Sequence, residues 1–140
     1  PDAPAEVVAD EVARHLEQEC TDLDGVVALP GALDLIAHLD AVGAAWAVVT
    51  SATARLARAR LGAAGITAPV LVSYEDVAAG KPAPDGFLEG ARRCGVGIET
   101  CLAVEDSAPG LAAARASGAT VINVGPCGTS LITLLGALRG

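Results

Sequence analysis

The feature that most constrains the fold is a regular alternation of short apolar runs with amphipathic segments of about ten residues. The apolar runs predict buried strands at residues 44–49, 70–72, 101–104 and 120–124. The intervening and following segments predict helices at 52–64, 85–94, 109–117 and 131–138. Continuous apolar strands that alternate with helices are typical of a parallel sheet covered on both faces. The sequence therefore predicts an α/β fold with a Rossmann-like parallel sheet flanked by helices.

Two further helices are predicted before the first strand. The first covers residues 4–19, where Val12 and Leu16 lie on a narrow apolar stripe among acidic residues. A narrow stripe indicates a helix at the periphery of the domain. The second begins after Leu29-Pro30-Gly31 and ends near Gly43, since proline near a helix start and glycine after its end are common boundaries.

Length and charge restrict the classes of function. A chain of 140 residues fits one domain. The formal net charge of −8 opposes binding to a polyanion, so neither nucleic acid nor an anionic membrane is an expected partner. The apolar runs are much shorter than the ~20 residues that a membrane span needs, and the N-terminus is acidic. We therefore expect a soluble protein without a signal peptide.

The cysteines indicate a reducing environment. Cys20, Cys94, Cys101 and Cys127 show no C-x-x-C spacing and no dense framework. Free thiols in a cytoplasmic protein fit this pattern better than disulfides or a structural zinc site.

Polar residues follow two of the apolar runs, and another lies in a loop between these two. Thr50 and Ser51 follow the first run, the acidic pair Glu105 and Asp106 follows the third, and Lys81 lies in a loop between the two. In open parallel sheets a ligand binds beyond the carboxyl ends of the strands, so these side chains are expected to converge on one edge. Each also has an ordinary alternative: Thr50 and one acid could cap the next helix, and Lys81 could be a solvated turn residue.

The chemistry of these residues suits a phosphoryl group and a divalent cation. Lys81 is the only lysine among nine basic residues, and its compact ammonium can neutralise a phosphoryl oxygen beside a carboxylate. Two charges at the end of an apolar strand need compensation, and carboxylate oxygens are suitable ligands for Mg²⁺. The residues alone therefore make Glu105 and Asp106 candidates for holding Mg²⁺ and Lys81 a candidate for neutralising a phosphoryl oxygen.

Three segments together resemble a known family. VVTSA at 48–52, GKPAPDGF at 80–87 and VEDSAPG at 104–110 look like motifs two, three and four of the haloacid dehalogenase-like superfamily. The similarity is greatest to its sugar-phosphatase and phosphoglucomutase-like branch, which has a helical cap. The resemblance implies that Thr50, with Ser51 assisting, binds the phosphoryl group and that Lys81 steadies nucleophile and phosphate. It also implies that Glu105 and Asp106 hold Mg²⁺ directly or through water.

The family's first motif, an apolar strand that ends in D-x-D-G-T, has no clear counterpart. Asp22-Leu23-Asp24-Gly25 has the carboxylate spacing of a nucleophile and an acid/base, but Glu17 to Thr21 cannot form a buried strand. Val26 also stands where threonine is expected. We therefore predict that the match arises by chance, although a catalytic role for Asp22 and Asp24 stays open.

The resemblance also predicts the domain organisation. It makes residues 1–21 a remnant of the helical cap and residues 22–140 the Rossmann-like core, without the nucleophile strand. In the family that strand lies between the strands that end at Thr50 and at Glu105, so its absence leaves backbone groups unpaired. A missing N-terminal segment, another chain, or the residues near Asp22 would have to complete the sheet.

Two functions follow as hypotheses. The first is Mg²⁺-dependent hydrolysis of a small phosphate monoester, such as a phosphorylated sugar metabolite, through an aspartyl-phosphate intermediate; a phosphomutase is a close variant. The second is a catalytically incomplete relative that keeps the fold and binds metal, phosphate or a partner chain.

Overall fold

The structure is a computed structural model that describes residues 5–140. Residues 1–4, which belong to the predicted cap remnant, lie outside the described part. Helices and short strands alternate along the chain in the predicted order. The helices are α1 (Ala5–Thr21), α2 (Ala32–Ala41), α3 (Ala54–Ala63), α4 (Asp85–Cys94), α5 (Ala108–Ser117) and α6 (Leu131–Arg139). The strands are β1 (Val48–Val49), β2 (Leu71–Val72), β3 (Leu102–Glu105) and β4 (Thr120–Asn123), with short 3₁₀ helices η1 (Tyr74–Asp76) and η2 (Ile98–Thr100).

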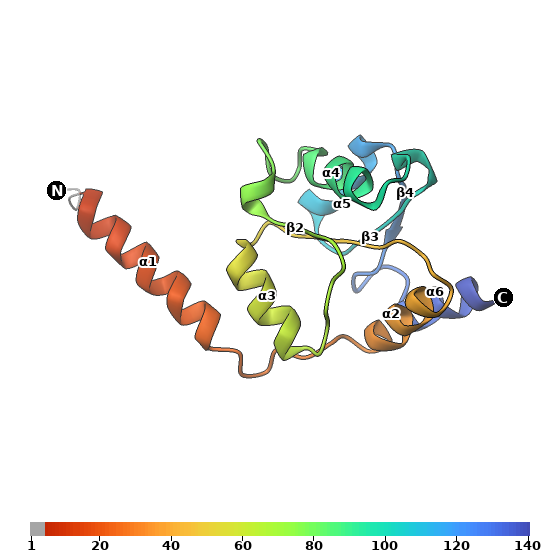
Figure 1. Ribbon diagram of the computed structural model, residues 1–140, viewed down its shortest axis with the longest axis horizontal. Helices are drawn as coiled ribbons and strands as arrows, with labels where there is room; N and C mark the ends of the chain where they lie inside the picture. Colours follow the sequence, from red (N-terminus) through yellow and green to blue (C-terminus); the bar gives the residue numbers. More distant parts are fainter. Residues whose placement is uncertain (1–4) are drawn as a thin grey trace.

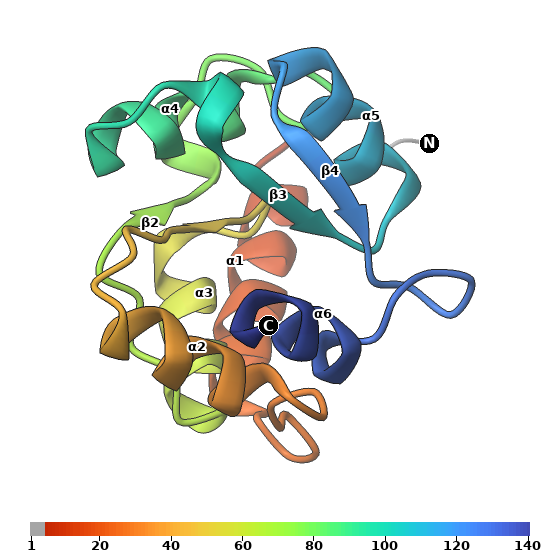
Figure 2. The ribbon, with the colours of Figure 1, turned by 90° about the vertical axis from the view of Figure 1, so that its right-hand side faces the viewer.

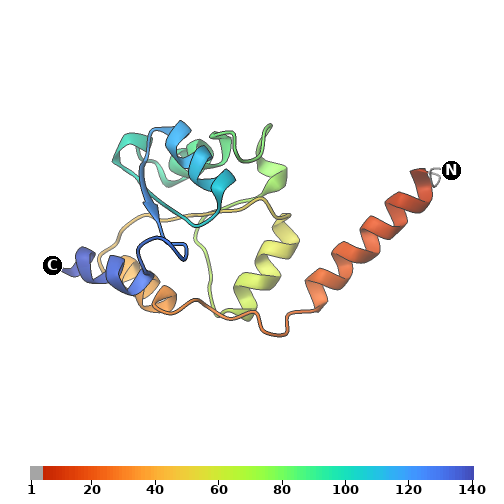
Figure 3. The ribbon, with the colours of Figure 1, turned by 180° about the vertical axis from the view of Figure 1, so that it is seen from behind.

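The strands form two separate parallel pairs within residues 5–140. β1 pairs with β2, placing Val48 opposite Leu71, and β3 pairs with β4, placing Ala103 opposite Val121. The strands lie between α4 and α5 on one side and α2, α3 and α6 on the other (Figures 1 and 3). This arrangement confirms an α/β fold of parallel strands flanked by helices.

The first strand is shorter than the sequence predicts. The apolar run at 44–49 was expected to form one strand, but only Val48 and Val49 do so. β1 has a strand neighbour on one side, and the amide of Ala44 instead donates to the carbonyl of Leu39 at the end of α2. Apolar character predicts burial, whereas a strand needs a partner for its backbone groups.

Small side chains build the core around α5. Ala113 and Ala114 on this helix are fully buried, and Ala103 on β3 is 5% exposed. Alanine lets α5 lie close to β3 and β4, with which it is in contact. Ser107 begins the helix, because its Oγ accepts a hydrogen bond from the amide of Gly110 at 3.1 Å. The packing of α5 on β3 and the Ser107 cap therefore fix the junction between the two elements, which carries the acidic pair.

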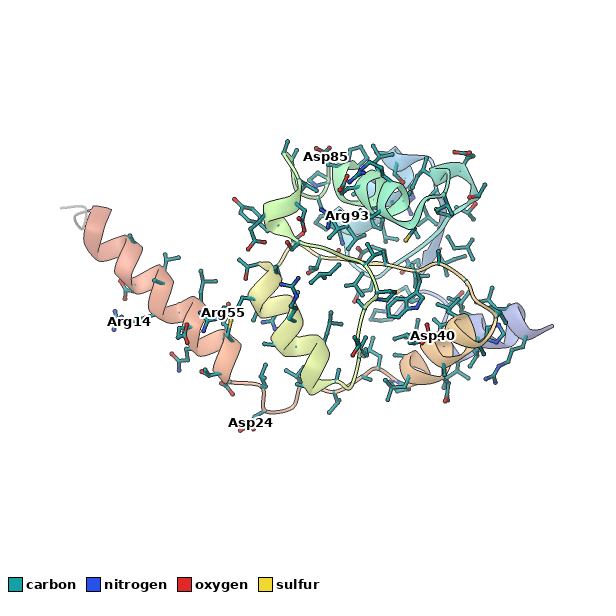
Figure 4. All side chains as sticks on the ribbon, in the orientation of Figure 1. Arg14, Asp24, Asp40, Arg55, Asp85 and Arg93 are labelled. Atoms are coloured by element: carbon teal, nitrogen blue, oxygen red, sulfur yellow. The ribbon has the colours of Figure 1, made fainter. Side chains whose placement is uncertain are left out.

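The N-terminal helix projects from the body of the molecule (Figures 1 and 3). It contacts α3, where Arg55 pairs with Glu17 and Arg60 with Glu19. Figure 4 shows Arg55 on the side of α3 that faces α1. Among residues 5–140, no helix combines the length and the apolarity that crossing a membrane requires.

Candidate active site

Lys81 joins the two strand pairs at their carboxyl ends. Its Nζ donates to the carbonyl oxygen of Val49, at the end of β1, at 3.2 Å. The same atom lies 2.6 Å from Oε2 of Glu105, at the end of β3. Both side chains of this ion pair are largely buried, at 14% and 10% exposed. Nζ also lies 5.2 Å from the ring centroid of Phe87, a favourable position for a cation.

Glu105 uses both of its carboxylate oxygens. Oε2 accepts from Lys81, and Oε1 accepts from the amides of Asp106 at 2.9 Å and Ser107 at 3.2 Å. Burial raises the pKa of Glu105, but the hydrogen bonds from Lys81 and the two amides outweigh it and lower that pKa to about 2. Gly110 leaves the space for this carboxylate, because a Cβ there would lie 2.1 Å from Oε2. Glu105 is therefore held as a charged partner of Lys81.

Thr50 lies beside Lys81 at the end of β1. Its amide donates to the carbonyl of Val72 at 2.9 Å, and its Oγ1 accepts from the amide of Ala52 at 3.1 Å. Thr50, Ser51 and Lys81 line the same small cavity of about 20 Å³. Ser51 is exposed at its edge. The structure thus brings together the three residues that were predicted to bind phosphate.

Asp106 differs from its neighbour because it is exposed. Among the residues whose side chains are described, no group of three or more His, Cys, Asp or Glu could hold a metal ion. The carboxylates that were predicted to hold Mg²⁺ are the exposed one of Asp106 and that of Glu105, whose oxygens already accept hydrogen bonds. Mg²⁺ commonly takes one or two carboxylates, with waters and substrate phosphate as its other ligands. Asp106 and Glu105 can therefore hold Mg²⁺ only if other oxygen ligands, such as waters and substrate phosphate, complete its coordination.

Residues that the sequence did not single out hold the loop that carries Lys81. Both the amide and the Oγ of Ser73 donate to Oδ2 of Asp76 at 2.8 Å. Arg93, on α4, donates to Oδ1 of Asp76 at 2.9 Å and to the carbonyl of Leu71 at 3.0 Å. The hydrogen bond from the Ser73 amide, followed by those from Arg93 and the Ser73 hydroxyl, lowers the pKa of Asp76 to about 2. This cluster ties β2, η1 and α4 together beside the site.

The D-L-D-G segment lies far from these residues. Residues 5–21 are helical, and Asp22 follows directly after α1, with its amide bonded to the carbonyl of Gln18. Figure 4 places Asp24 near the C-terminal end of α3. Thr50 lies at the other end, shortly before the helix begins at Ala54. The length of α3, about 15 Å, separates the two positions. Within the described chain, Asp24 is not part of the site.

Comparison with known proteins agrees with this geometry. The sequence model of the haloacid dehalogenase-like hydrolase family matches residues 2–118, most of the chain. The chain belongs to the haloacid dehalogenase-like hydrolases. Hexitol phosphatase A of Escherichia coli (strain K12) is 43% identical over 118 residues, which are 84% of this chain and 55% of that protein. Protein CbbY of Rhodobacter capsulatus is 38% identical over 99 residues, 67% of this chain and 44% of that protein.

Solved structures of haloacid dehalogenase-like hydrolases share the fold. A variant of CbbY from Rhodobacter sphaeroides, in complex with Xylulose-(1,5)bisphosphate, superposes with a TM-score of 0.78 and is 30% identical. The superposition covers 87% of this chain and 57% of that one. A hydrolase from Pseudomonas syringae superposes with a TM-score of 0.66 at 35% identity, over 69% of this chain and 46% of that one. The chain spans about half the length of the relatives it matches.

Proposed function

We propose that the site works in Mg²⁺-dependent hydrolysis of a small phosphate monoester of the sugar-phosphate class. The observation that carries this proposal is the position of Lys81, whose ammonium lies between the ends of β1 and β3 and shares a cavity with Thr50. A fixed cation and a hydroxyl at one sheet edge suit the oxygens of a phosphoryl group. Membership of a hydrolase family and similarity to a hexitol phosphatase support the same reaction.

Each residue has a separate task in this proposal. Thr50 donates its hydroxyl proton to one phosphoryl oxygen, and Ser51 assists at the exposed edge. Lys81 neutralises charge on the transferring group, and Glu105 keeps that ammonium in place, since both oxygens of Glu105 are already bonded. Asp106 is the carboxylate that is free to hold Mg²⁺, with Glu105 acting through water. When bound, Mg²⁺ polarises the phosphoryl group and screens the charge that develops on it.

The nucleophile of this reaction is a carboxylate that attacks phosphorus and displaces the alcohol of the substrate, which leaves after it gains a proton. The resulting aspartyl-phosphate is then hydrolysed by water, which releases inorganic phosphate and restores the carboxylate. Asp22 and Asp24 do not supply it in this proposal, because they follow α1 rather than a strand at the site. The attacking carboxylate must instead stand beside Lys81, at the carboxyl edge of the sheet. Lys81 would then orient it as well as the phosphoryl group.

A phosphate-release assay with hexitol phosphates, in Mg²⁺ and in EDTA, tests the proposal. With the attacking carboxylate in place beside Lys81, we expect Mg²⁺-dependent turnover that falls by about 100-fold in Thr50→Val, which lacks the hydroxyl donor. The double variant Asp22→Asn/Asp24→Asn is the control and should keep full activity. Turnover that is independent of Mg²⁺, or equal in Thr50→Val, would overturn the assignment.

The second candidate is a domain that binds phosphate and metal without turnover. It is favoured by one observation: among the side chains that the structure describes, the carboxylate paired with Lys81 is that of Glu105 alone. Calorimetric titration with inorganic phosphate separates the two. Mg²⁺-dependent binding that Thr50→Val abolishes, with no phosphate release from any hexitol phosphate, would establish this second function and exclude the first for the chain alone.

A further inference from the structure

The cavity that Thr50 and Lys81 share is too small for a whole substrate. Its volume is about 20 Å³, which gives room for roughly one water-sized group. An oxygen of a phosphoryl group can enter it, whereas a body of the size of a sugar cannot. The carbon body of a phosphate monoester must therefore lie outside the cavity, against the residues of its rim.

Tyr74 is the large side chain on that rim. The residues that line the cavity and are exposed are Ser51, Tyr74, Ala79 and Gly80. Tyr74 is 64% exposed, whereas Trp46 and Phe87, the other two aromatic residues of the chain, are partly covered. A substrate body on the rim therefore meets an aromatic residue among small neighbours.

The backbone that carries Tyr74 is fixed on both sides of the residue. The amide of Tyr74 donates to the carbonyl of Ala52 at 2.9 Å. The carboxylate of Glu75, the next residue, accepts from the first amide of α3 at 3.0 Å. Ser73, the residue before, is 2% exposed and donates twice to Asp76. The polar groups of η1 are therefore engaged within the protein, and an exposed ring is presented on a preorganised turn, which lowers the entropy cost of a contact.

Tyr74 and the charged groups of the site lie on different sides of Thr50. β1, which ends before Thr50, pairs with β2, and Lys81 links it to β3. η1 follows β2, which lies at the opposite edge of the strands from β4 (Figure 2). Figure 1 shows residues 74–76, in green, on the side of the body toward α1. The ion pair and Asp106 are therefore on the β3 side of the phosphate position, and the aromatic residue is on the β2 side.

We propose that Tyr74 selects phosphate monoesters whose carbon body has a flat, apolar face, such as a pyranose ring, over monoesters with an open carbon chain. A large rigid ring offers its contact area to a flat partner, whereas an open chain must lose the freedom of several bonds to lie against it. The inference rests on the proposed function, since it places the phosphoryl group at Thr50 and Lys81. Tyr74 takes no part in bond breaking in this account, and its role is to determine specificity.

Matched probes separate the contact with the carbon body from the contact with phosphate. The probes are inorganic phosphate and the methylene phosphonate analogues of glucose 6-phosphate and sorbitol 6-phosphate. The two analogues have the same number of carbon atoms, differ in ring against open chain, and cannot be hydrolysed. Calorimetric titration in Mg²⁺ gives the Kd of each probe for the native chain and its variants.

We expect the native chain to bind the glucose analogue about fivefold more tightly than the sorbitol analogue. Tyr74→Ala should bind the two analogues equally and inorganic phosphate with unchanged affinity. Tyr74→Phe keeps the aromatic ring and should keep the preference. Leu88→Ala is the control, because it removes an exposed apolar side chain of α4 that does not line the cavity, and it should change none of the three affinities.

A second measurement observes the ring directly. Tyr74 is the single tyrosine of the chain, so isotope labelling of tyrosine gives one set of ring signals in an NMR spectrum. These signals should shift as the glucose analogue is added and reach a plateau at the Kd found by calorimetry. Inorganic phosphate should shift them much less.

The outcomes distinguish this inference from the proposed function. A ring preference that survives in Tyr74→Ala, that is lost equally in Leu88→Ala, or that the native chain lacks would overturn the inference, while bound inorganic phosphate would leave the proposed function standing. Failure of all three probes to bind would overturn both. A preference that Tyr74→Ala removes, in a chain that releases no phosphate from any monoester, would support the inference and count against turnover by the chain alone.

Discussion

The carboxyl edge of the sheet and the gap between β1 and β3 are bounded by the same two strands, yet the edge is bridged by hydrogen bonds and the gap is not. At the edge, Lys81 bonds to Val49 and Glu105 and joins the two strand pairs. Along the gap, the edges of β1 and β3 that are not paired with β2 and β4 have no partner strand within residues 5–140. The difference shows that the site is assembled by loops and helix starts, with side chains that reach across the gap. The sheet itself needs backbone contacts that no side chain can replace.

The largest expected effect comes from removing the charge that spans the gap. Lys81→Met leaves Glu105 buried without a partner and should lower the free energy of unfolding by about 3–5 kcal/mol. Urea titration followed by circular dichroism measures it. Arg60→Met is the control, because its pair with Glu19 is exposed and 3.9 Å long, and it should cost about 0.5 kcal/mol or less. Similar losses in both variants would mean that the edge is not held by Lys81.

A second prediction concerns the packing of the carboxyl edge at Gly110, which lies against the Glu105 carboxylate. A Cβ at Gly110 must displace that carboxylate, so Gly110→Ala should destabilise the fold by about 1–3 kcal/mol. The matched change Gly136→Ala, in α6, meets no atom within 4 Å and should stabilise by about 0.5–1 kcal/mol. Thermal unfolding of both variants compares them. A stabilising Gly110→Ala would show that Glu105 is free to move.

A smaller loss of stability is expected when the contacts beside the loop that carries Lys81 are removed. Arg93→Leu removes the bonds to Asp76, Leu71 and Glu89 and should cost about 1.5 kcal/mol. Arg92→Leu, one residue earlier, loses only an exposed pair with Glu89 and should cost about 0.5 kcal/mol or less. Urea titration of the two variants measures the difference in the free energy of unfolding. Equal losses would mean that the Arg93 cluster does not stabilise the loop that carries Lys81.

A further effect is a change in the pH dependence of stability. The pKa of Glu105 is about 2, below its ordinary value of 4.5, so the folded state favours the charged form. The resulting stabilisation is complete above pH 4.5, declines as the pH falls, and is lost below about pH 2. Glu105→Gln should therefore lose stability less steeply than the native chain between pH 5 and 3 in thermal scans. Parallel curves would mean that Glu105 is not held in its charged form.

Much of the fold and of the site could be predicted from the sequence, because both depend on local pattern. The bounds of α4 and the order of helices and strands follow from the spacing of apolar residues, and the motifs place Thr50, Lys81 and Glu105 together. The short β1 could not be predicted from its own residues, because pairing depends on a neighbouring strand.

Other features required contacts between distant segments. Asp76 and Arg93 are 17 residues apart, and neither belongs to a motif that signals their pairing. Glu105 was predicted as a ligand of Mg²⁺, a role that stays a prediction, and the structure shows that both of its oxygens already accept hydrogen bonds. Gly110 lies within the VEDSAPG segment, where the final glycine was the available signal for close packing.

A double-mutant cycle across the gap tests the central claim, that Lys81 and Glu105 form one buried unit at the carboxyl edge. The free energy of unfolding is measured for the native chain, Lys81→Met, Glu105→Gln and the double variant. The two single losses should exceed the loss in the double variant by a coupling of about 2 kcal/mol or more. Losses that simply add would mean that the two residues act independently and would contradict the site described above.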